Sequence, residues 1–90
     1  MTTKKYIIEA DANLVLAVWV KGTPIPQYDQ SIWRRDAYGS AMNYSEYGNR
    51  DSEYGWEMDH ITPVSRGGSD ALSNLRPLNW RNNAGRGDGR

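Results

Sequence analysis

The longest apolar stretch of the chain is Leu14–Val20, which contains no charged residue. Its apolar positions fit one face of an α-helix, but a continuous run rich in β-branched residues also suits a buried strand. Asp11 can cap the start of a helix, and Lys21-Gly22 followed by Pro24 is typical of a helix end. We therefore predict a short helix from about residue 12 to 21, with a structural role as a lid over the core.

The middle of the chain alternates short apolar segments with turn residues. Residues 23–26 contain two prolines and predict a connector. Residues 32–36 predict a strand, residues 36–39 a turn, and residues 40–44 the returning strand of a β-hairpin. The polar stretch from 45 to 55 then predicts a surface loop. We expect three tyrosines to anchor this loop to the core: Tyr44, Tyr47 and Tyr54.

A second strand is predicted from Tyr54 to Ile61. It ends near Pro63, which lacks the N–H that a strand ladder needs. The segment Arg66–Asp70 contains two glycines, which permit positive φ and predict a wide turn.

The chain then predicts a partner strand and a short helix. Residues 75–78 are the partner strand, and residues 80–84 are the helix. Asn79 or Pro77 is expected to open this helix, and Gly85 and Gly87 are expected to end it. From Tyr54 onward the predicted unit is strand, long loop, strand and helix.

Composition limits both the architecture and the chemistry. Ninety residues form one small domain, and the absence of cysteine excludes disulfides and thiolate zinc sites. A single histidine also excludes a zinc knuckle of the Cys/His type. Four tryptophans and six tyrosines supply the bulk of the core, with Trp56 and Trp80 expected inside it rather than stacked on bases. No segment resembles a signal peptide or a membrane span, so we expect a cytoplasmic protein with no membrane partner.

The charge of the chain is unevenly distributed. The formal net charge is zero, yet residues 61–90 contain five arginines, two aspartates and no lysine. Arginine binds phosphate through a planar fork, so this composition favours a nucleic-acid partner over a merely soluble tail. The candidate contacts are Arg66, Arg76, Arg81 and Arg86, with Arg76 and Arg81 equally consistent with solvated charges.

The polar residues with the clearest chemistry are Asp59 and His60. Asn74 follows His60 by fourteen residues, and Asn83 follows it by twenty-three. A carboxylate–histidine pair followed by two amides is the outline of a small metal-dependent nuclease site. The alternatives are a structural histidine, a salt bridge from Asp59 to an arginine, an Asx-turn at Asn74 and a helix cap or surface amide at Asn83. Successive strand residues point to opposite faces, so we expect an irregular strand end if Asp59 and His60 share one site.

Five separated segments together resemble the HNH endonucleases, especially small cysteine-free bacterial and phage members. The segments of the signature are Asp59-His60-Ile61-Thr62-Pro63, Gly67-Gly68, Asn74-Leu75, Pro77-Leu78 and Asn82-Asn83. Two upstream segments are also similar to those members: Trp33-Arg34-Arg35-Asp36-Ala37-Tyr38-Gly39, and Tyr54 to His60. The resemblance covers about residues 32–88, and Asn83 makes the chain an H-N-N variant.

The resemblance implies a fold and a domain organisation. The fold is α+β, with a ββα-metal (HNH or His-Me finger) core, an N-terminal helix and an additional β-hairpin. One nuclease domain would span residues 1–90. Its parts are a helical and connector segment at 1–30, a hairpin and loop at 31–53, and the ββα-metal core at 54–88.

The resemblance also implies hydrolysis of DNA, most naturally double-stranded DNA. His60 would be the general base that activates water, and Asn74 would organise the loop around it. Asp59 and Asn83 would bind one divalent ion, with Mg²⁺ preferred and Mn²⁺, Ni²⁺ or Zn²⁺ as alternatives. Family members often have lysine where Arg86 stands. Two alternatives to an independent endonuclease are a nucleic-acid-binding module with weakened catalysis and a subunit active only within a larger phage or bacterial assembly.

Overall fold

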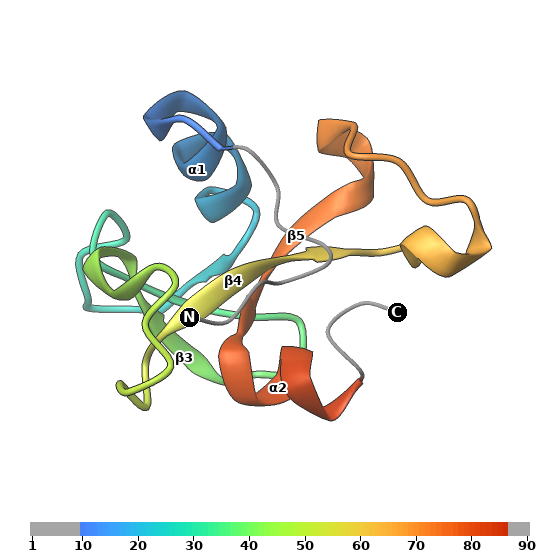
Figure 1. Ribbon diagram of the computed structural model, residues 1–90. Coiled ribbons are helices and arrows are strands. Elements are labelled where there is room, and N and C mark those ends of the chain that lie inside the picture. The colour runs from blue at the N-terminus through green and yellow to red at the C-terminus, as the bar shows by residue number, and fades with distance from the viewer. Residues whose placement is uncertain (1–9, 87–90) are drawn as a thin grey trace.

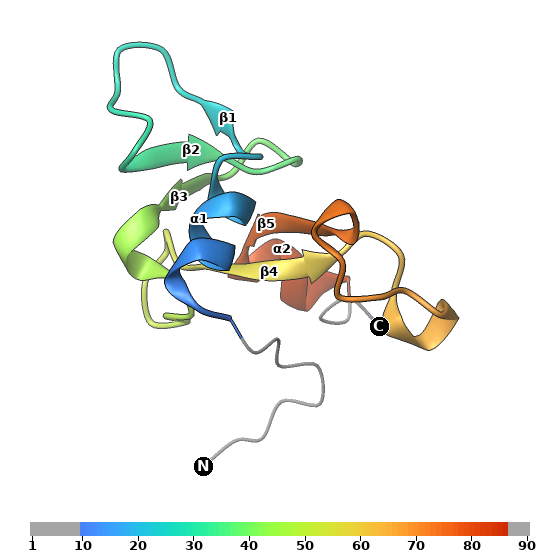
Figure 2. The same cartoon turned by 90° about the horizontal axis from the view of Figure 1, so that it is seen from above.

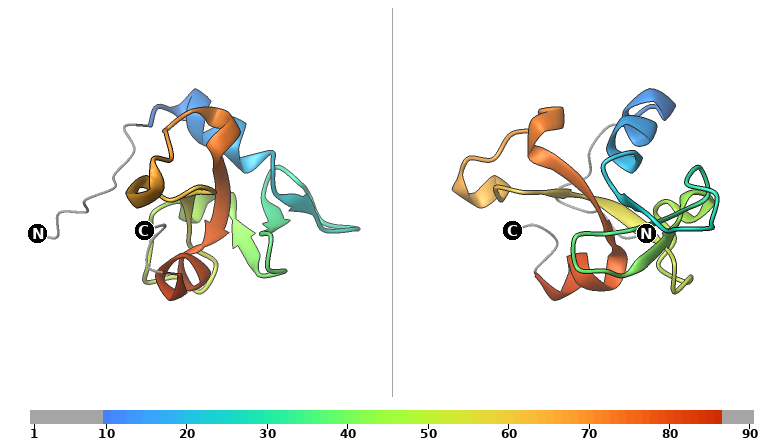
Figure 3. Two further views of the ribbon diagram at one scale, coloured as in Figure 1. Left: turned by 90° about the vertical axis from the view of Figure 1, so that its right-hand side faces the viewer. Right: turned by 180° about the vertical axis from the view of Figure 1, so that it is seen from behind.

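The computed structural model describes residues 10–86 as an α+β fold with two small antiparallel sheets. The central element is a two-stranded sheet of β4 (Trp56–His60) and β5 (Leu75–Asn79). Helix α1 (Ala12–Trp19) lies on one side of this sheet and helix α2 (Trp80–Gly85) lies on the other (Figures 1 and 3). The predicted order of strand, long loop, strand and helix after residue 54 is confirmed for these elements.

The predicted N-terminal helix is confirmed as α1. The Asp11 side chain caps its start by accepting a hydrogen bond of 2.9 Å from the Leu14 amide. The helix ends at Trp19, and Gly22 then donates its amide hydrogen to the Trp19 carbonyl. The part of the predicted 1–30 segment that precedes residue 10 lies outside the described residues. Across residues 10–86, no helix has the length and apolar character needed to cross a membrane.

The predicted hairpin is present but belongs to a larger sheet. Strands β2 (Trp33–Arg35) and β3 (Ala41–Asn43) pair as an antiparallel hairpin, with Gly39 at φ 87° in the turn. The expectation that residues 23–26 form only a connector was wrong, because β1 (Thr23–Pro24) pairs with β2. Proline is compatible with this position because β1 is an edge strand. Figure 2 shows this three-stranded sheet beside the unit of α1, β4 and β5.

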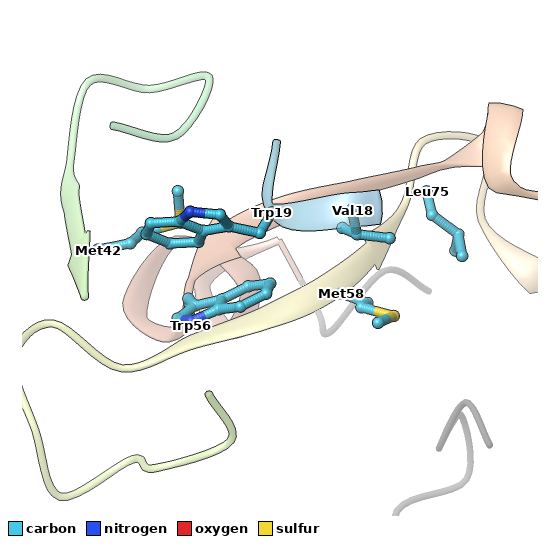
Figure 4. Close-up of a cluster of buried hydrophobic side chains, with 6 residues drawn as sticks. All are labelled: Val18, Trp19, Met42, Trp56, Met58 and Leu75. Atoms are coloured by element: carbon cyan, nitrogen blue, oxygen red, sulfur yellow. The ribbon is translucent and has the colours of Figure 1, made fainter. Parts of the chain in front are cut away.

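Aromatic residues form the centre of the core, between α1 and the start of β4 (Figure 4). Trp19 and Trp56 are almost fully buried, and their ring centroids are 5.2 Å apart. Tyr44 packs edge-on against Trp19, and Tyr47 lies 4.7 Å from the Trp56 ring. Tyr54 packs against Trp33 of the second sheet. The prediction that tyrosines anchor the 45–55 loop to the core is therefore confirmed for Tyr44 and Tyr47, whereas Tyr54 packs outside the core cluster.

Asp36 joins the second sheet to the end of β5. Its side chain is buried and accepts hydrogen bonds from the backbone amides of Tyr38 and Ser40 in the hairpin turn. The same carboxylate accepts from the Asn79 amide and from the Asn82 side chain. Since Asn79 precedes α2 and Asn82 lies within it, one carboxylate fixes this helix to the hairpin.

Replacing Asp36 is expected to destabilise the domain. Asp36→Ala removes four hydrogen bonds to a charged acceptor and leaves a buried amide unpaired, so we expect a loss of about 3 kcal/mol in the free energy of unfolding. Urea denaturation followed by tryptophan fluorescence measures this change. Asp51→Ala, at an exposed position, is the matched control and should change stability by less than about 0.5 kcal/mol. Equal stability of the two variants would show that Asp36 does not join the two parts of the fold.

Candidate active site

Strand β4 has a polar side and an apolar side. Alternation along the strand places Trp56 and Met58 in the core with α1, and Glu57 and Asp59 on the side of α2. The strand pairs regularly with β5 up to His60, which lies opposite Leu75. The expectation of an irregular strand end at Asp59 and His60 was therefore wrong, because regular pairing continues through both residues. It stops only beyond them, where the Thr62 amide bonds to the Asn74 side chain.

Asp59 is the centre of a cluster of positive charge. Its side chain is fully buried and accepts hydrogen bonds from Arg76 Nε at 2.8 Å and from Arg86 Nη1 at 2.5 Å. Arg76 stands directly opposite Asp59 on β5, and Arg86 follows the end of α2. Partial burial alone would lower the pKa of Arg76, but its hydrogen bond and charge interaction with Asp59 outweigh this and raise it. The salt bridge considered as an alternative role for Asp59 is therefore present, and it concentrates two guanidinium groups beside the carboxylate.

Asn83 lies on the side of α2 that faces β4. Asn79 caps this helix by accepting a hydrogen bond from the Arg81 amide, which confirms one of the two predicted helix starts. The neighbouring Asn82 faces the hairpin, where it bonds to Asp36 and Ser40. Asn83 is buried, and its Nδ2 donates to Glu57 Oε1 at 2.9 Å. Helix α2 ends at Gly85, whereas the predicted contribution of Gly87 lies outside the described residues.

The other end of the Asn83 amide has no hydrogen-bond partner. Among the described residues, Asn83 Oδ1 is the one buried side-chain polar atom without a partner. An oxygen in this state is costly to bury, and it is a hard donor of the kind that Mg²⁺ or Mn²⁺ prefers.

His60 contacts the loop that connects β4 to β5. The imidazole is buried, and its Nε2 lies 2.6 Å from Asp70 Oδ1. A carboxylate accepts hydrogen bonds, so this contact favours the tautomer that carries its proton on Nε2 and leaves Nδ1 as the basic nitrogen. Asp59 and His60, although adjacent, thus have different partners: arginines for the first and the loop for the second.

Asn74 closes this loop, which projects away from the sheet in Figure 1. Its Oδ1 accepts from the Thr62 amide at 2.8 Å, and its Nδ2 donates to the carbonyls of Thr62 and Ser69. Its role is therefore to tie the two ends of the loop together, which is compatible with the predicted organising function. It does not itself contact His60 through any of these bonds.

The two loop glycines act for different reasons. Gly67 has φ 86°, as expected for a wide turn. The same explanation was wrong for Gly68, whose φ is not positive. A Cβ atom at Gly68 would lie 1.7 Å from the Thr62 carbonyl oxygen and 2.9 Å from Asn74 Nδ2. Gly68 is needed because its backbone passes close to Thr62 and to the Asn74 side chain, which leaves no room for a Cβ atom.

The remaining predicted arginines lie in different places. Arg66 is exposed at the end of a short 3₁₀ turn in the loop (Val64–Arg66). Arg81 lies over the Trp80 ring, with 5.4 Å between its guanidinium carbon and the ring centroid. Trp80 is half-buried and bonds to the Ser52 carbonyl, so it is part of the packing at this edge of the core. Arg86 is the candidate arginine that contacts Asp59 together with Arg76.

The donor set around α2 and β4 fits a divalent ion. Asp59 supplies a carboxylate and Asn83 supplies the unpartnered Oδ1. No group of three or more His, Cys, Asp or Glu side chains with metal-binding geometry occurs among residues 10–86. Two oxygen donors suit an ion that retains water and binds a phosphate, as Mg²⁺ commonly does, rather than one enclosed entirely by protein.

Three important residues were not singled out from the sequence. Glu57 could have been recognised, because it lies two residues before Asp59 and therefore on the same face of the strand. Arg50, which forms an ion pair with Glu57, lies in a loop and has no periodic signal. Asp70 likewise becomes recognisable only when the loop brings it to His60.

One comparison with known proteins found a match. Residues 47–88 match the HNH endonuclease family, and this segment contains β4, the loop, β5 and α2. This match supports the resemblance to the HNH endonucleases that the motifs indicated. Among curated proteins and among solved structures, none matches the chain. The family relationship associates the domain with nuclease activity in general.

The loop tie can be tested independently of any activity. Asn74→Ala removes two hydrogen bonds between the loop ends and a third to Ser69 within the loop. We therefore expect faster amide exchange at Thr62 and faster proteolysis between residues 62 and 71. Global stability should fall by about 1–2 kcal/mol, because the tie is only partly buried. Asn49→Ala, in an exposed turn, is the control and should leave exchange at Thr62 unchanged. If the Thr62 amide exchanges equally slowly in Asn74→Ala, the Asn74 side chain does not hold the loop ends together.

Proposed function

We propose that this protein is a metal-dependent endonuclease that hydrolyses phosphodiester bonds in DNA. The observation that carries the proposal is the buried, unpartnered Oδ1 of Asn83 on the same side of β4 as the Asp59 carboxylate. A buried oxygen without a hydrogen-bond partner costs stability, and a bound cation would satisfy it. The HNH endonuclease match over residues 47–88 supports nuclease activity in general.

The proposed division of roles follows from the contacts. Asp59 and Asn83 Oδ1 would hold one divalent ion, for which Mg²⁺ is the first candidate. When bound, this ion supplies Lewis acidity beside the scissile phosphate and stabilises the departing 3′ oxygen. His60 accepts a proton from water at Nδ1, while Asp70 holds Nε2 and thereby fixes the ring. Asn74 keeps the loop that bears Asp70 closed.

The arginines would supply the phosphate-binding surface. Arg86 and Arg76 place two positive charges beside Asp59, where a phosphate at the metal would also lie. For each of them, contact with phosphate would replace part of the interaction with the carboxylate. Arg66 on the loop and Arg81 on α2 would add to this surface. Double-stranded DNA is the proposed substrate, and hydrolysis would leave 5′-phosphate and 3′-hydroxyl ends.

One observation favours a second function, a nucleic-acid-binding module with weakened catalysis. Both oxygens of Asp59 already accept hydrogen bonds from arginines. A cation must compete with these guanidinium groups, which would lower its affinity. DNA binding without cleavage in any divalent metal would support this function instead.

Plasmid cleavage tests the enzymatic proposal. With Mg²⁺ or Mn²⁺ we expect nicking that a chelator abolishes, and His60→Ala should reduce the rate by at least about 100-fold because the general base is lost. The control is Glu46→Gln, distant in the sequence from the site, which should cut at the normal rate. Cleavage that resists the chelator, or full activity of His60→Ala, would contradict the proposal.

The salt dependence of DNA binding tests whether Arg86 contacts phosphate. Arg86→Gln should reduce the slope of log K against log salt by about one, because one fewer phosphate is neutralised. Arg35→Gln, with the same charge change on the exposed part of β2, should leave the slope unchanged. The slope is measured by fluorescence anisotropy in Ca²⁺ between low and moderate salt. Equal slopes for the unsubstituted protein and Arg86→Gln would remove Arg86 from the interface.

A further inference from the structure

Glu57 and Asn83 form a buried pair between β4 and α2. Glu57 is 7% exposed and Asn83 is 4% exposed, and Nδ2 of the amide donates to Oε1 of the carboxylate at 2.9 Å. Glu57 precedes Asp59 by two residues, so both side chains lie on the same side of the strand. Glu57 therefore reaches the nitrogen end of the amide whose oxygen end is the candidate metal ligand.

Arg50 also holds the Glu57 carboxylate. Its Nε donates to Oε2 at 2.6 Å, and its Nη2 donates to Oε1 at 2.7 Å. This two-bond pairing fixes the plane of the carboxylate. Burial raises the pKa of the nearby Tyr47 phenol, and the negative charge of Glu57 raises it further. An ionised carboxylate only accepts hydrogen bonds.

The two ends of an amide are nearly equal in size but opposite in polarity. With its NH₂ on Glu57, Asn83 directs Oδ1 away from Glu57, where it has no partner. The reversed amide would place its oxygen against a carboxylate and its N–H groups toward a cation, which is unfavourable at both ends. The choice between these orientations therefore depends on Glu57.

We propose that Glu57, held by Arg50, is a positioning residue that orients the Asn83 amide so that Oδ1 faces the divalent ion. This inference rests on the proposed function and adds to it a residue outside the ligand set. Glu57 itself does not touch the ion or the substrate. Its contribution is the direction of a neutral side chain that can otherwise present either end.

A symmetric ligand separates this role from a general electrostatic one. A carboxylate at position 83 presents oxygen in either orientation, so it needs no partner to orient it. If Glu57 acts only through its negative charge or through packing, Glu57→Gln should weaken metal binding whether residue 83 is amide or carboxylate. If Glu57 orients the amide, the effect should depend on the amide.

Titration calorimetry with Mn²⁺ measures this dependence without any cleavage assay. In the otherwise unsubstituted protein, Glu57→Gln should weaken Mn²⁺ binding by about tenfold, as replacement of a group that orients a ligand commonly does. In the Asn83→Asp background, the same substitution should not weaken binding, because the ligand is symmetric and an unfavourable carboxylate pair is removed. Glu46→Gln is the control, since Glu46 Oε1 accepts from Asn49 Nδ2 at 2.8 Å in an exposed Glu–Asn pair.

Each result has a definite meaning. An equal loss of Mn²⁺ affinity in both backgrounds, or no loss in either, overturns the orienting role while leaving the metal-dependent nuclease intact. Failure of the unsubstituted protein to bind Mn²⁺ or Mg²⁺ at millimolar concentration overturns the metal site itself. Circular dichroism confirms that each variant is folded. If Glu57→Gln does not fold, Arg50→Gln, at a side chain 36% exposed, should give the same dependence on residue 83 with a smaller factor.

Discussion

The burial of two carboxylates on one side of β4 is the constraint on which the site depends. Glu57 and Asp59 are both nearly inaccessible to water, and each must therefore be paired. Arg50 pairs with Glu57, while Arg76 and Arg86 pair with Asp59. Buried ion pairs generally stabilise a fold less than apolar residues of the same size would. These ion pairs therefore add little to the stability of so small a domain. Their presence is better explained by the proposed site on the side of β4 that faces α2.

The other side of the same strand supplies the stability. Trp56 packs against Trp19 of α1, and Met58 and Leu75 extend this apolar layer along the sheet. The chain has no disulfide and cannot enclose a second core, so this single layer has to anchor β4 firmly. A five-residue strand thus carries two functions through its alternation: one set of side chains fixes its position, and the other presents charged groups toward α2.

Much of this arrangement could be predicted from the sequence because it depends on local patterns. Asp11 before an apolar run predicted α1, and the order from residue 54 onward predicted two strands and a short helix. Other features depend on contacts between distant segments and have no local signal. The pairing of β1 with β2 was missed because Pro24 is tolerated only at an edge, and Asp70 reaches His60 only through the folded loop. The need for glycine at position 68 also has no local signal, because it arises from the close approach of Thr62 and not from a positive φ angle. The roles assigned to Asp59, His60, Asn74 and Asn83 remain predictions, now with specific partners.

The position of Asn83 does not depend on the intrinsic stability of its helix. Helix α2 has only six residues and ends at a glycine, so it would not persist in isolation. Side chains hold it instead: Asn79 caps its start, Asn82 bonds to Asp36 of the hairpin turn, and Asn83 bonds to Glu57 of β4. The two contacts that reach outside the helix, to Asp36 and to Glu57, fix its position against the hairpin and against β4. The precision needed at Asn83 therefore comes from the hairpin and from β4, which explains how a short, glycine-terminated helix can present a buried oxygen at a defined place.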